Sequence, residues 1–382
     1  MEKSEKIMRY IAEKINVVNR KIFYLNRKKI GKSCQGMDTS DCFMEYRRFV
    51  NENTSVGYRV EIVKLSCDEK AEYKWTGAQY YNDSVYGIPN SAETFLRYHI
   101  PTKQTEFTKY TGNEEFKWTG GTIWGNRIYA FPRSSNTILA YMPSEDSFLM
   151  IEAIEKYAGE HHYGGACSEK GIVYQPPRNT DHILLWDLNT GASRLIRLTA
   201  VWRKLKLDYC ASLIHPNGFI YFFPVNGKII KMNLITEEWE FIGGRIKSGA
   251  FEVKIACDGN IYGFNSLEGI LKVSVSSDVV ETIYSEKFIG AYGTKLGING
   301  KLYSIPGKGR CVWEYSPLED KLNAIYDTES SQQAKYAGGV TLPHGDIIGM
   351  PENEMQILII RPESKSVVIP DEIYQKFWVD CY

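Results

Sequence analysis

Seven short segments of the sequence begin with residues that could hold an anion or move a proton. Their first residues are Lys74, Lys117, His162, Asp208, Ala250, Ala291 and Lys335. Ammonium groups bind carboxylates and phosphates, and a histidine beside a carboxylate is a general acid or base. The segments follow one another at intervals of 41 to 46 residues. A repeated structure must therefore position these side chains, and its geometry decides which of them meet.

The segments are copies of one motif. "KWTGAQYYNDSVYGIP" begins at Lys74 and "KWTGGTIWGNRIYAFP" at Lys117, and five more divergent copies follow. The aromatic residue at the second position is the most regular feature. It falls at Trp75, Trp118, Tyr163, Tyr209, Phe251, Tyr292 and Tyr336. Self-similarity with a period near 43 residues predicts a repeat architecture.

Each copy predicts four short strands. A turn such as "GN", "PNG" or "DGN" follows the first run, and these residues tolerate the backbone of tight hairpins. Alternating or fully apolar runs follow, for example "RIYAFP", "TILAYMP" and "FLMIEAI". Seven such units predict an all-β fold, a seven-bladed β-propeller of four-stranded antiparallel blades. We assign residues 58–382 to the propeller and 1–57 to an N-terminal helix and connector.

The units resemble blades of the broad kelch, NHL and streptogramin-lyase group of seven-bladed propellers, over roughly residues 74 to 370. The resemblance specifies blade geometry and no single family. It also implies where a lyase would keep its His and Glu catalysts, on late blades of the ligand face. Here the late blades open with Ala250 and Ala291, so no catalytic residue of that group carries over.

The second-position aromatic has two interpretations. It is a wedge packed between blades or a member of a ligand-stacking ring, and we favour the wedge because every blade must bury both faces. Small residues at the fourth and fifth positions, such as Gly120 and Gly121, suit innermost strands close to an axis.

The N-terminal segment has a different pattern. Apolar residues recur at steps of three and four and predict an amphipathic helix; they are Ile7, Ile11, Ile15, Val18 and Ile22. Residues 1–31 hold nine Lys or Arg and three Glu, which raises membrane-surface and nucleic-acid binding as alternatives. We favour a helix docked on the propeller or on a protein partner. Further on, "YRVEIVKLS" alternates as a strand that could add to a blade edge and help close the ring.

Bulk properties limit the function classes. Lys plus Arg equal Asp plus Glu at 46 each, so no global field favours nucleic acid. No run reaches eighteen apolar residues, so we predict no membrane span, and the charged start does not suit a signal peptide. The eight scattered cysteines indicate neither a metal site nor a disulfide framework, and we predict a cytoplasmic protein. We expect no cofactor, since the usual fingerprints are missing.

We predict the ligand site at the channel mouth, where the repeat openings meet the loops that follow the second strands. Lys254 and Lys295 lie four residues after their repeat openings and so share a side of the strand with them. Lysines gathered at a narrow mouth either hold an anion or extend into water at the rim. The predicted ligand-binding residues are Lys74, Trp75, Lys117, Trp118, Arg133, Tyr163, Arg178, Tyr209, Lys254, Lys295, Lys335 and Tyr336.

Two functions follow from this arrangement. The first is a binding platform for an anionic small molecule, an acidic peptide or an acidic sugar, with rings for stacking and cations for the acid. The alternative is a lyase or hydrolase in which His162 or His161 is the acid or base and Asp208 orients it. His162 and Asp208 open adjacent repeats, so a propeller would bring them near each other.

Overall fold

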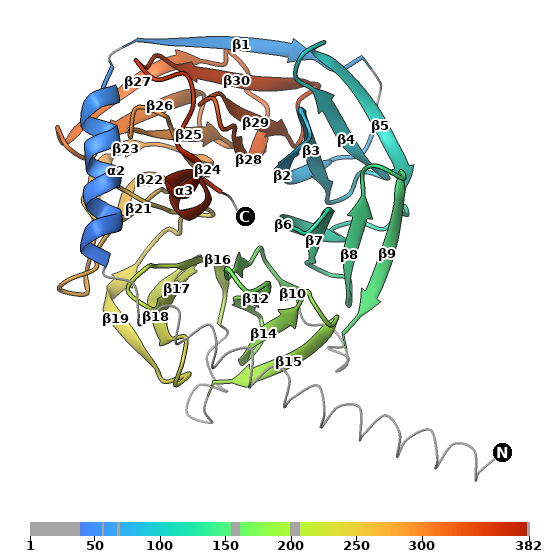
Figure 1. Cartoon of the computed structure of the whole chain (residues 1–382), viewed down its shortest axis with the longest axis horizontal. Coiled ribbons are helices and arrows are strands. Elements are labelled where there is room, and N and C mark those ends of the chain that lie inside the picture. Colours follow the sequence, from blue (N-terminus) through green and yellow to red (C-terminus); the bar gives the residue numbers. More distant parts are fainter. Residues whose placement is uncertain (1–38, 56, 67–68, 154–160, 199–206, 380–382) are drawn as a thin grey trace.

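The structure is a computed structural model that describes residues 39–55, 57–66, 69–153, 161–198 and 207–379. The amphipathic helix expected around residues 7–22 lies outside these ranges. Seven four-stranded sheets stand around a central channel, which confirms the predicted seven-bladed propeller (Figure 1). Strands within each sheet are antiparallel.

The blades follow the sequence repeat in order. The first three are β2 (Trp75–Tyr81), β3 (Ser84–Pro89), β4 (Thr94–His99), β5 (Gln104–Tyr110); β6 (Trp118–Trp124), β7 (Arg127–Pro132), β8 (Thr137–Met142), β9 (Ser147–Glu152); and β11 (Ala166–Cys167), β12 (Ile172–Gln175), β14 (His182–Asp187), β15 (Ala192–Arg197). The next three are β16 (Tyr209–Ile214), β17 (Phe219–Pro224), β18 (Gly227–Asn233), β19 (Trp239–Ile246); β20 (Lys254–Ile255), β21 (Ile261–Phe264), β22 (Glu268–Ser274), β23 (Val279–Phe288); and β24 (Ala291–Leu296), β25 (Leu302–Pro306), β26 (Cys311–Ser316), β27 (Lys321–Asp327). The seventh has β28 (Tyr336–Thr341), β29 (Ile347–Pro351), β30 (Gln356–Pro362) and β1 (Tyr58–Lys64), and a small extra sheet pairs β10 (His161–His162) with β13 (Pro177–Arg178).

Strand β1 closes the ring. It pairs along its whole length with β30, from Tyr58 opposite Pro362 to Lys64 opposite Gln356. Blade seven therefore takes its outer strand from the beginning of the chain, as the alternation in "YRVEIVKLS" predicted. The junction also carries an ion pair of 2.5 Å between Arg361 and Glu61.

The repeated glycine forms a bulge in the innermost strand. Gly120 has φ 66°, a backbone conformation that side chains disfavour, and the pairing register shifts between Trp118 and Gly121. Gly121 has its own constraint, because an added Cβ would lie 2.3 Å from the carbonyl oxygen of Tyr129. The small residues thus serve a local bulge as well as the approach to the axis.

Four of the seven repeated aromatics are wedges. Trp75, Trp118, Tyr209 and Tyr336 are almost completely buried. The first three also bind the carbonyl oxygen nineteen residues further along, where the third strand begins. Trp75 Nε1 donates to Thr94, Trp118 Nε1 to Thr137 and the Tyr209 hydroxyl to Lys228, at 2.7–2.9 Å. Each of these three wedges therefore fastens the first strand of a blade to its third.

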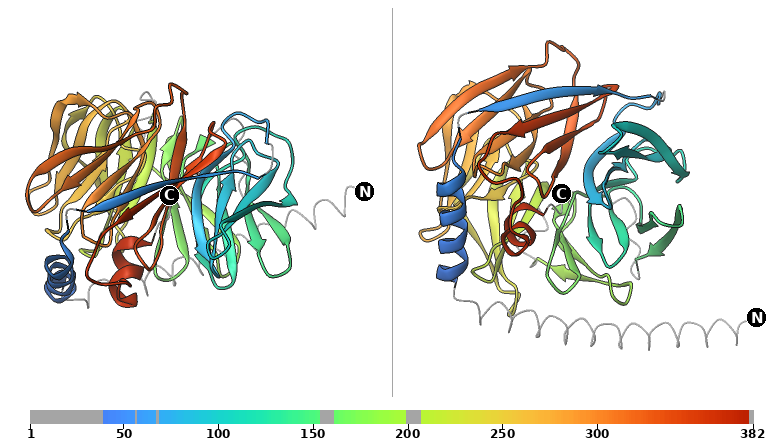
Figure 2. Two further views of the ribbon diagram at one scale, coloured as in Figure 1. Left: turned by 90° about the horizontal axis from the view of Figure 1, so that it is seen from above. Right: turned by 45° about the horizontal axis from the view of Figure 1, so that its top comes forward.

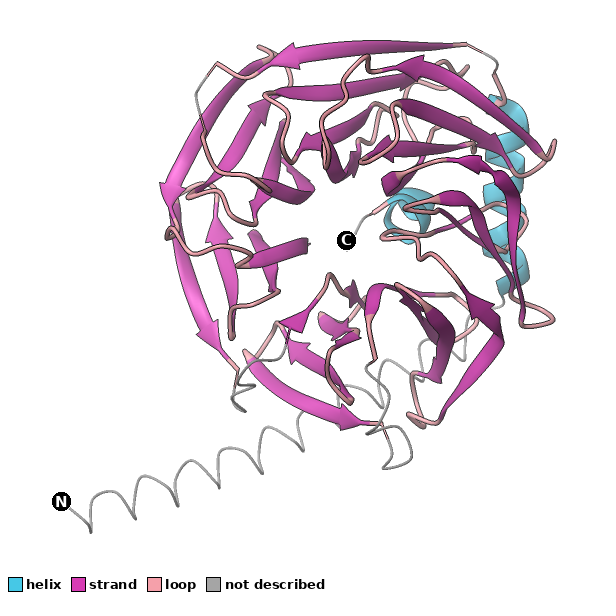
Figure 3. Ribbon diagram, turned by 180° about the vertical axis from the view of Figure 1, so that it is seen from behind, coloured by secondary structure: helices cyan, strands magenta, loops and turns pink. Residues whose placement is uncertain are grey.

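Two helical segments lie on one face of the ring (Figure 2), and Figure 3 shows the opposite face. They are α2 (Thr39–Asn53) and the C-terminal α3 (Asp371–Ile373) with its continuation η2 (Tyr374–Trp378). The sequence predicted only a connector with a little helix where α2 forms. Tyr46 of α2 donates to the Ile255 carbonyl, and Trp378 donates to the Gly297 carbonyl, so both segments are fixed to first-turn loops.

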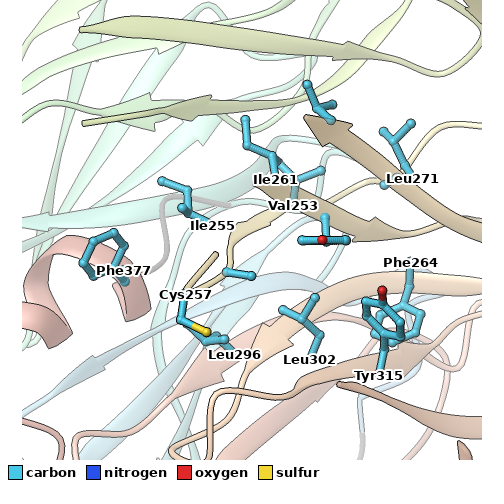
Figure 4. Close-up of a cluster of buried hydrophobic side chains, with 14 of the residues drawn as sticks. Val253, Ile255, Cys257, Ile261, Phe264, Leu271, Leu296, Leu302, Tyr315 and Phe377 are labelled. Carbon is cyan, nitrogen blue, oxygen red and sulfur yellow. The ribbon is translucent and has the colours of Figure 1, made fainter. Parts of the chain in front are cut away.

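The two segments also pack on each other. The rings of Tyr46 and Phe377 stack at 4.4 Å, and Phe377 joins a buried cluster with Ile255 and Cys257 of blade five (Figure 4). Helix α2 is amphipathic, and its apolar face packs on the buried cluster of blades four to six. This packing explains why a stretch that the sequence signalled only weakly forms a full helix. Neither described helical segment has the length and hydropathy that spanning a bilayer requires.

Candidate functional site

The repeat openings and the loops after the second strands meet at one end of the channel, as predicted. The backbone N–H of Arg133 donates to the carbonyl of Lys117, and that of Glu352 donates to Lys335, at 2.9 and 2.8 Å. Equivalent bonds join Asn90 to Lys74. This end of the channel is the mouth discussed below, and α2 and α3 lie at the other end.

The lysines that open three repeats are buried. Lys74, Lys117 and Lys335 are at most 4% exposed. The Lys117 ammonium donates to the carbonyls of Ala92 and Glu114, and the Lys335 ammonium donates to the carbonyl of Gln332. These side chains do not extend into water at the rim. The carbonyl bonds of Lys117 and Lys335 fix the loops between blades, and ligand binding by them stays a prediction.

Lys254 and Lys295 share the carboxylate of Glu252. Their ammonium groups lie 3.6 and 2.5 Å from Glu252 Oε1, and the backbone N–H of Thr294 donates to Oε2. Lys295 also donates to the Gly339 carbonyl. Burial lowers the pKa of Lys295, and Glu252 opposes that change. The structure therefore places these two lysines in an ion-pair cluster inside the channel.

The remaining repeated aromatics face the channel. Tyr163 and Phe251 have ring centres 5.6 Å apart, and Phe251 and Tyr292 have ring centres 5.2 Å apart. These residues come from blades three, five and six, so their rings meet across the axis. We call them the aromatic layer. The sequence favoured a wedge at every repeat; Phe251 and Tyr292 are only half-buried, whereas Tyr163 is buried against Cys210 of blade four and also touches Phe251.

Two arginines stack on this layer. The guanidinium of Arg133 lies 4.3 Å from the Phe116 ring centre and 5.3 Å from that of Tyr163, and Arg178 lies 4.5 Å from Tyr163. Such contacts hold a guanidinium in place without consuming its N–H donors. Within the described residues the Arg133 guanidinium has no hydrogen bond and no ion pair. Its donors are left for another partner.

A buried polar chain lies beside Arg133. Asn90 Nδ2 donates to the Thr76 hydroxyl at 2.7 Å, and that hydroxyl in turn donates to Glu352 Oε1 at 3.3 Å. Glu352 Oε2 and Asn90 Oδ1 are buried and have no hydrogen-bond partner among the described residues. Orphaned buried polar atoms are rare and indicate either strain or a missing partner.

Burial raises the pKa of Glu352 to about 8, although Arg133 and Lys74 lower it. The carboxyl is therefore largely protonated at neutral pH and is a hydrogen-bond donor. The same electrostatic neighbourhood includes Tyr292, whose pKa is raised by burial first and then by Glu352, Tyr163 and Tyr73. Side chains of blades one, two, three, six and seven thus converge on one point near the axis.

Tyr73 and Phe116 reach the mouth through unusual backbone conformations. Their φ angles are 52° and 56°, in the left-handed region that large side chains avoid. Each stands directly before the lysine that opens its repeat, and the two rings lie 5.6 Å apart. Ala334 has the same conformation before Lys335, with φ 50°, so this backbone geometry recurs at the entry of several blades.

The predicted acid–base group is only partly described. Strand β13 pairs with His161 and His162 on one side, and Arg178 forms a bridge with Asp208 on the other, so the backbone brings these residues together. Arg178 Nε lies 3.4 Å from Asp208 Oδ1. The side chains of His161 and His162 lie outside the described part of the structure, so their catalytic role stays a prediction.

Sequence reasoning missed Tyr73, Phe116, Phe251, Tyr292 and Glu352. The first two carried a signal, because an aromatic precedes both copies of "KW". Phe251 and Tyr292 were recognised only as repeat positions. Glu352 follows the proline that ends the second strand of blade seven, the repeat position that Asn90 and Arg133 occupy in blades one and two, so its sequence position carried a signal for its place. Its burial is a property of the closed ring.

Comparison with solved structures shows which proteins share this fold. The chain is similar in fold to streptogramin B lyases. Virginiamycin B lyase from Staphylococcus aureus matches with a TM-score of 0.66 at 11% identity, over 80% of this chain and 100% of that chain. A streptogramin B lyase structure matches with a TM-score of 0.64 at 11% identity, over 80% of this chain and 97% of that one. A computationally designed protein matches with a TM-score of 0.55 at 11% identity, over 80% and 100%.

No protein-family model and no curated protein matches the sequence. Identities of 11% show the fold alone. The presence of a designed protein among the matches makes the same point, because this fold does not specify a chemistry. Function has to be argued from the site.

Proposed function

We propose that this propeller binds a small acidic molecule at its channel mouth, with the acid group on Arg133 and a ring or flat face on the aromatic layer. The observation that carries the proposal is the Arg133 guanidinium, which two rings hold in place and no described side chain neutralises. Planar guanidinium groups bind carboxylates and phosphates through paired hydrogen bonds.

The orphaned atoms of Glu352 and Asn90 support a ligand with further polar groups. A protonated Glu352 donates to a ligand oxygen, and Asn90 Oδ1 accepts from a hydroxyl or amide. An acidic sugar or a hydroxylated aromatic acid has both kinds of group. A second arginine, Arg178, has its guanidinium 4.5 Å from the Tyr163 ring centre, and Asp208 Oδ1 lies 3.4 Å from its Nε.

Matched pairs of probes test the proposal. Thermal unfolding is measured with benzoate, glucuronate and inorganic phosphate at constant ionic strength, and with the neutral analogues benzamide and glucose. We expect at least one acid to raise the Tm, no neutral analogue to do so, and Arg133→Gln to remove the shift. Arg127→Gln is the control, because Arg127 is exposed at the far end of the same blade. Acid shifts that survive in Arg133→Gln would refute the assignment.

We propose lyase or hydrolase chemistry at the same mouth as a second candidate. It is favoured by the backbone pairing that sets His161 and His162 beside Arg178 and Asp208, next to the aromatic layer. A histidine near a carboxylate and a protonated Glu352 would supply an acid and a base. Loss of turnover in His162→Ala, with ligand affinity retained, distinguishes this candidate from a binding protein.

A further inference from the structure

A hollow lies inside the propeller, away from the mouth. It has a volume of about 460 Å³, within the range of ligand pockets in proteins. The first strands of blades two to five wall it, from Thr122 to Ile255 in chain order, and residues of the C-terminal segment from Glu372 to Val379 complete it. We call it the inner cavity.

The aromatic layer divides the inner cavity from the mouth. Phe251 lines the cavity and also touches the rings of Tyr163 and Tyr292. Gly164 and Cys210, beside the layer, line the cavity as well, whereas Arg133 and Glu352 do not. A molecule in the inner cavity would therefore contact none of the polar groups proposed for the mouth.

Much of the cavity wall is apolar. Six apolar side chains that line it are only half-buried; they are Ile123, Trp124, Leu213, Ile214, Phe251 and Val379. Covering their remaining surface would stabilise a complex, because removing apolar area from water is favourable. This wall therefore favours a ligand with an apolar body.

Two charged residues of the wall pair with each other, and Glu169, Glu372 and Lys376 also line the cavity. Glu252 and Lys254 both line the cavity and lie 3.6 Å apart, with Lys295 behind them on the same carboxylate. A charged ligand would lose its hydration beside an ion pair that does not need it, which is costly. A neutral hydroxyl or amide would lose much less and could still bond to these groups.

We propose that the inner cavity is a second, independent binding site, for an uncharged and mainly apolar small molecule that carries one hydrogen-bonding group. It requires neither Arg133 nor the ligand of the mouth. The C-terminal segment is part of the site, because Phe377 and Val379 form its wall at the helical face.

Two fluorescent probes of nearly equal shape test the class of ligand. The neutral 1-N-phenylnaphthylamine should bind to the full chain saturably, at one molecule per chain, and its sulfonated analogue 8-anilinonaphthalene-1-sulfonate should bind at least tenfold more weakly. Arg133→Gln should leave the neutral probe's Kd unchanged, which separates this proposal from the mouth site. Absence of saturable binding, or tighter binding of the sulfonate, overturns it.

Filling the cavity tests the location. Ser212→Phe and Ile214→Trp should each weaken the neutral probe about tenfold or more, whereas Ser212→Ala and Ile214→Val should not. Ser212→Ala is a matched control, because it also loses the hydroxyl bond to the Tyr174 carbonyl. Equal Kd values in filled and control variants overturn the location.

Cys167 provides a readout that needs no variant. It lines the cavity and is half-buried. In the unmodified protein, the neutral probe should slow alkylation of Cys167 by N-ethylmaleimide several-fold and leave Cys42 and Cys311 unaffected, as followed by peptide mass mapping. An unchanged Cys167 rate at saturating probe overturns the proposal.

Discussion

Arg133 and Phe116 are in face-to-cation contact at the channel mouth, with the guanidinium 4.3 Å from the centre of the ring. Phe116 precedes the first strand of blade two and Arg133 follows its second strand, so one blade provides both. The contact stabilises a cation that no described carboxylate pairs with.

Lysine should not replace Arg133. Arg133→Lys keeps the charge but loses the planar fork and the stacking surface, so affinity for an acid should fall about tenfold or more. Titration calorimetry with the best-binding probe acid checks this. Equal affinity in Arg133→Lys would mean that only the charge matters.

The affinity for an acid should depend on the charge of Glu352. Its pKa of about 8 means that it becomes an anion beside Arg133 as the pH rises through that value. Binding of an acid should therefore weaken between pH 7 and pH 9. Glu352→Gln should remove this dependence, and the same pH slope in both proteins would rule out Glu352 as its source.

The same carboxyl should make stability depend on pH. Its pKa is about 8 in the folded protein against an ordinary value of 4.5, so the folded state holds the proton more tightly. The stabilising contribution is complete below pH 4.5 and is lost as the pH rises to about 8. Over this window, the free energy of unfolding of Glu352→Gln should rise relative to that of the wild type, by on the order of a few kcal/mol. Tm measurements from pH 5 to pH 9 test this, and a constant difference between the proteins contradicts it.

Lys117 should matter for stability and not for the ligand. Lys117→Met removes two hydrogen bonds from a buried ammonium to carbonyl oxygens. We expect the free energy of unfolding to fall by about 1–3 kcal/mol and the Tm to fall with it. Affinity for an acid should change less than twofold. A large affinity loss at unchanged Tm would instead support the lysine site predicted from the sequence.

Wedge and channel aromatics should differ in their effect on folding. Trp118 is 1% exposed and bonds to the Thr137 carbonyl, so Trp118→Ala should destabilise by about 3–5 kcal/mol. Phe251 is half-buried and faces the cavity, so Phe251→Leu should cost less than about 1.5 kcal/mol. Chemical unfolding of both variants decides this, and similar losses would contradict the division of the repeated aromatics into two classes.

The fold could be predicted because each repeat of about 43 residues contains the local signals that determine one blade. Turn residues, alternating strands and the second-position aromatic are local signals, and β1 was recognisable by its alternation. The roles of the repeated aromatics were not local. Trp118 and Phe251 occupy the same repeat position, and only the neighbouring blades determine that one is a wedge and the other faces the axis.

The candidate site could be predicted from the sequence only in outline, and its location stays a prediction. Arg133, Arg178 and Tyr163 were named from their repeat positions and lie together. The lysines were expected to be the cations of the site, but sequence position does not reveal that Lys117 bends back to carbonyls of the preceding loop. The C-terminal segment that completes the inner cavity has no repeat partner and gave no signal.

The most direct test of the central claim is a crystal structure of the protein with the probe acid that raises its Tm most. We predict the acid group within hydrogen-bonding distance of the Arg133 guanidinium and the body of the ligand against Tyr163 or Tyr292. Density for the acid in the inner cavity or on an outer blade edge, with Arg133 unliganded, would contradict the account.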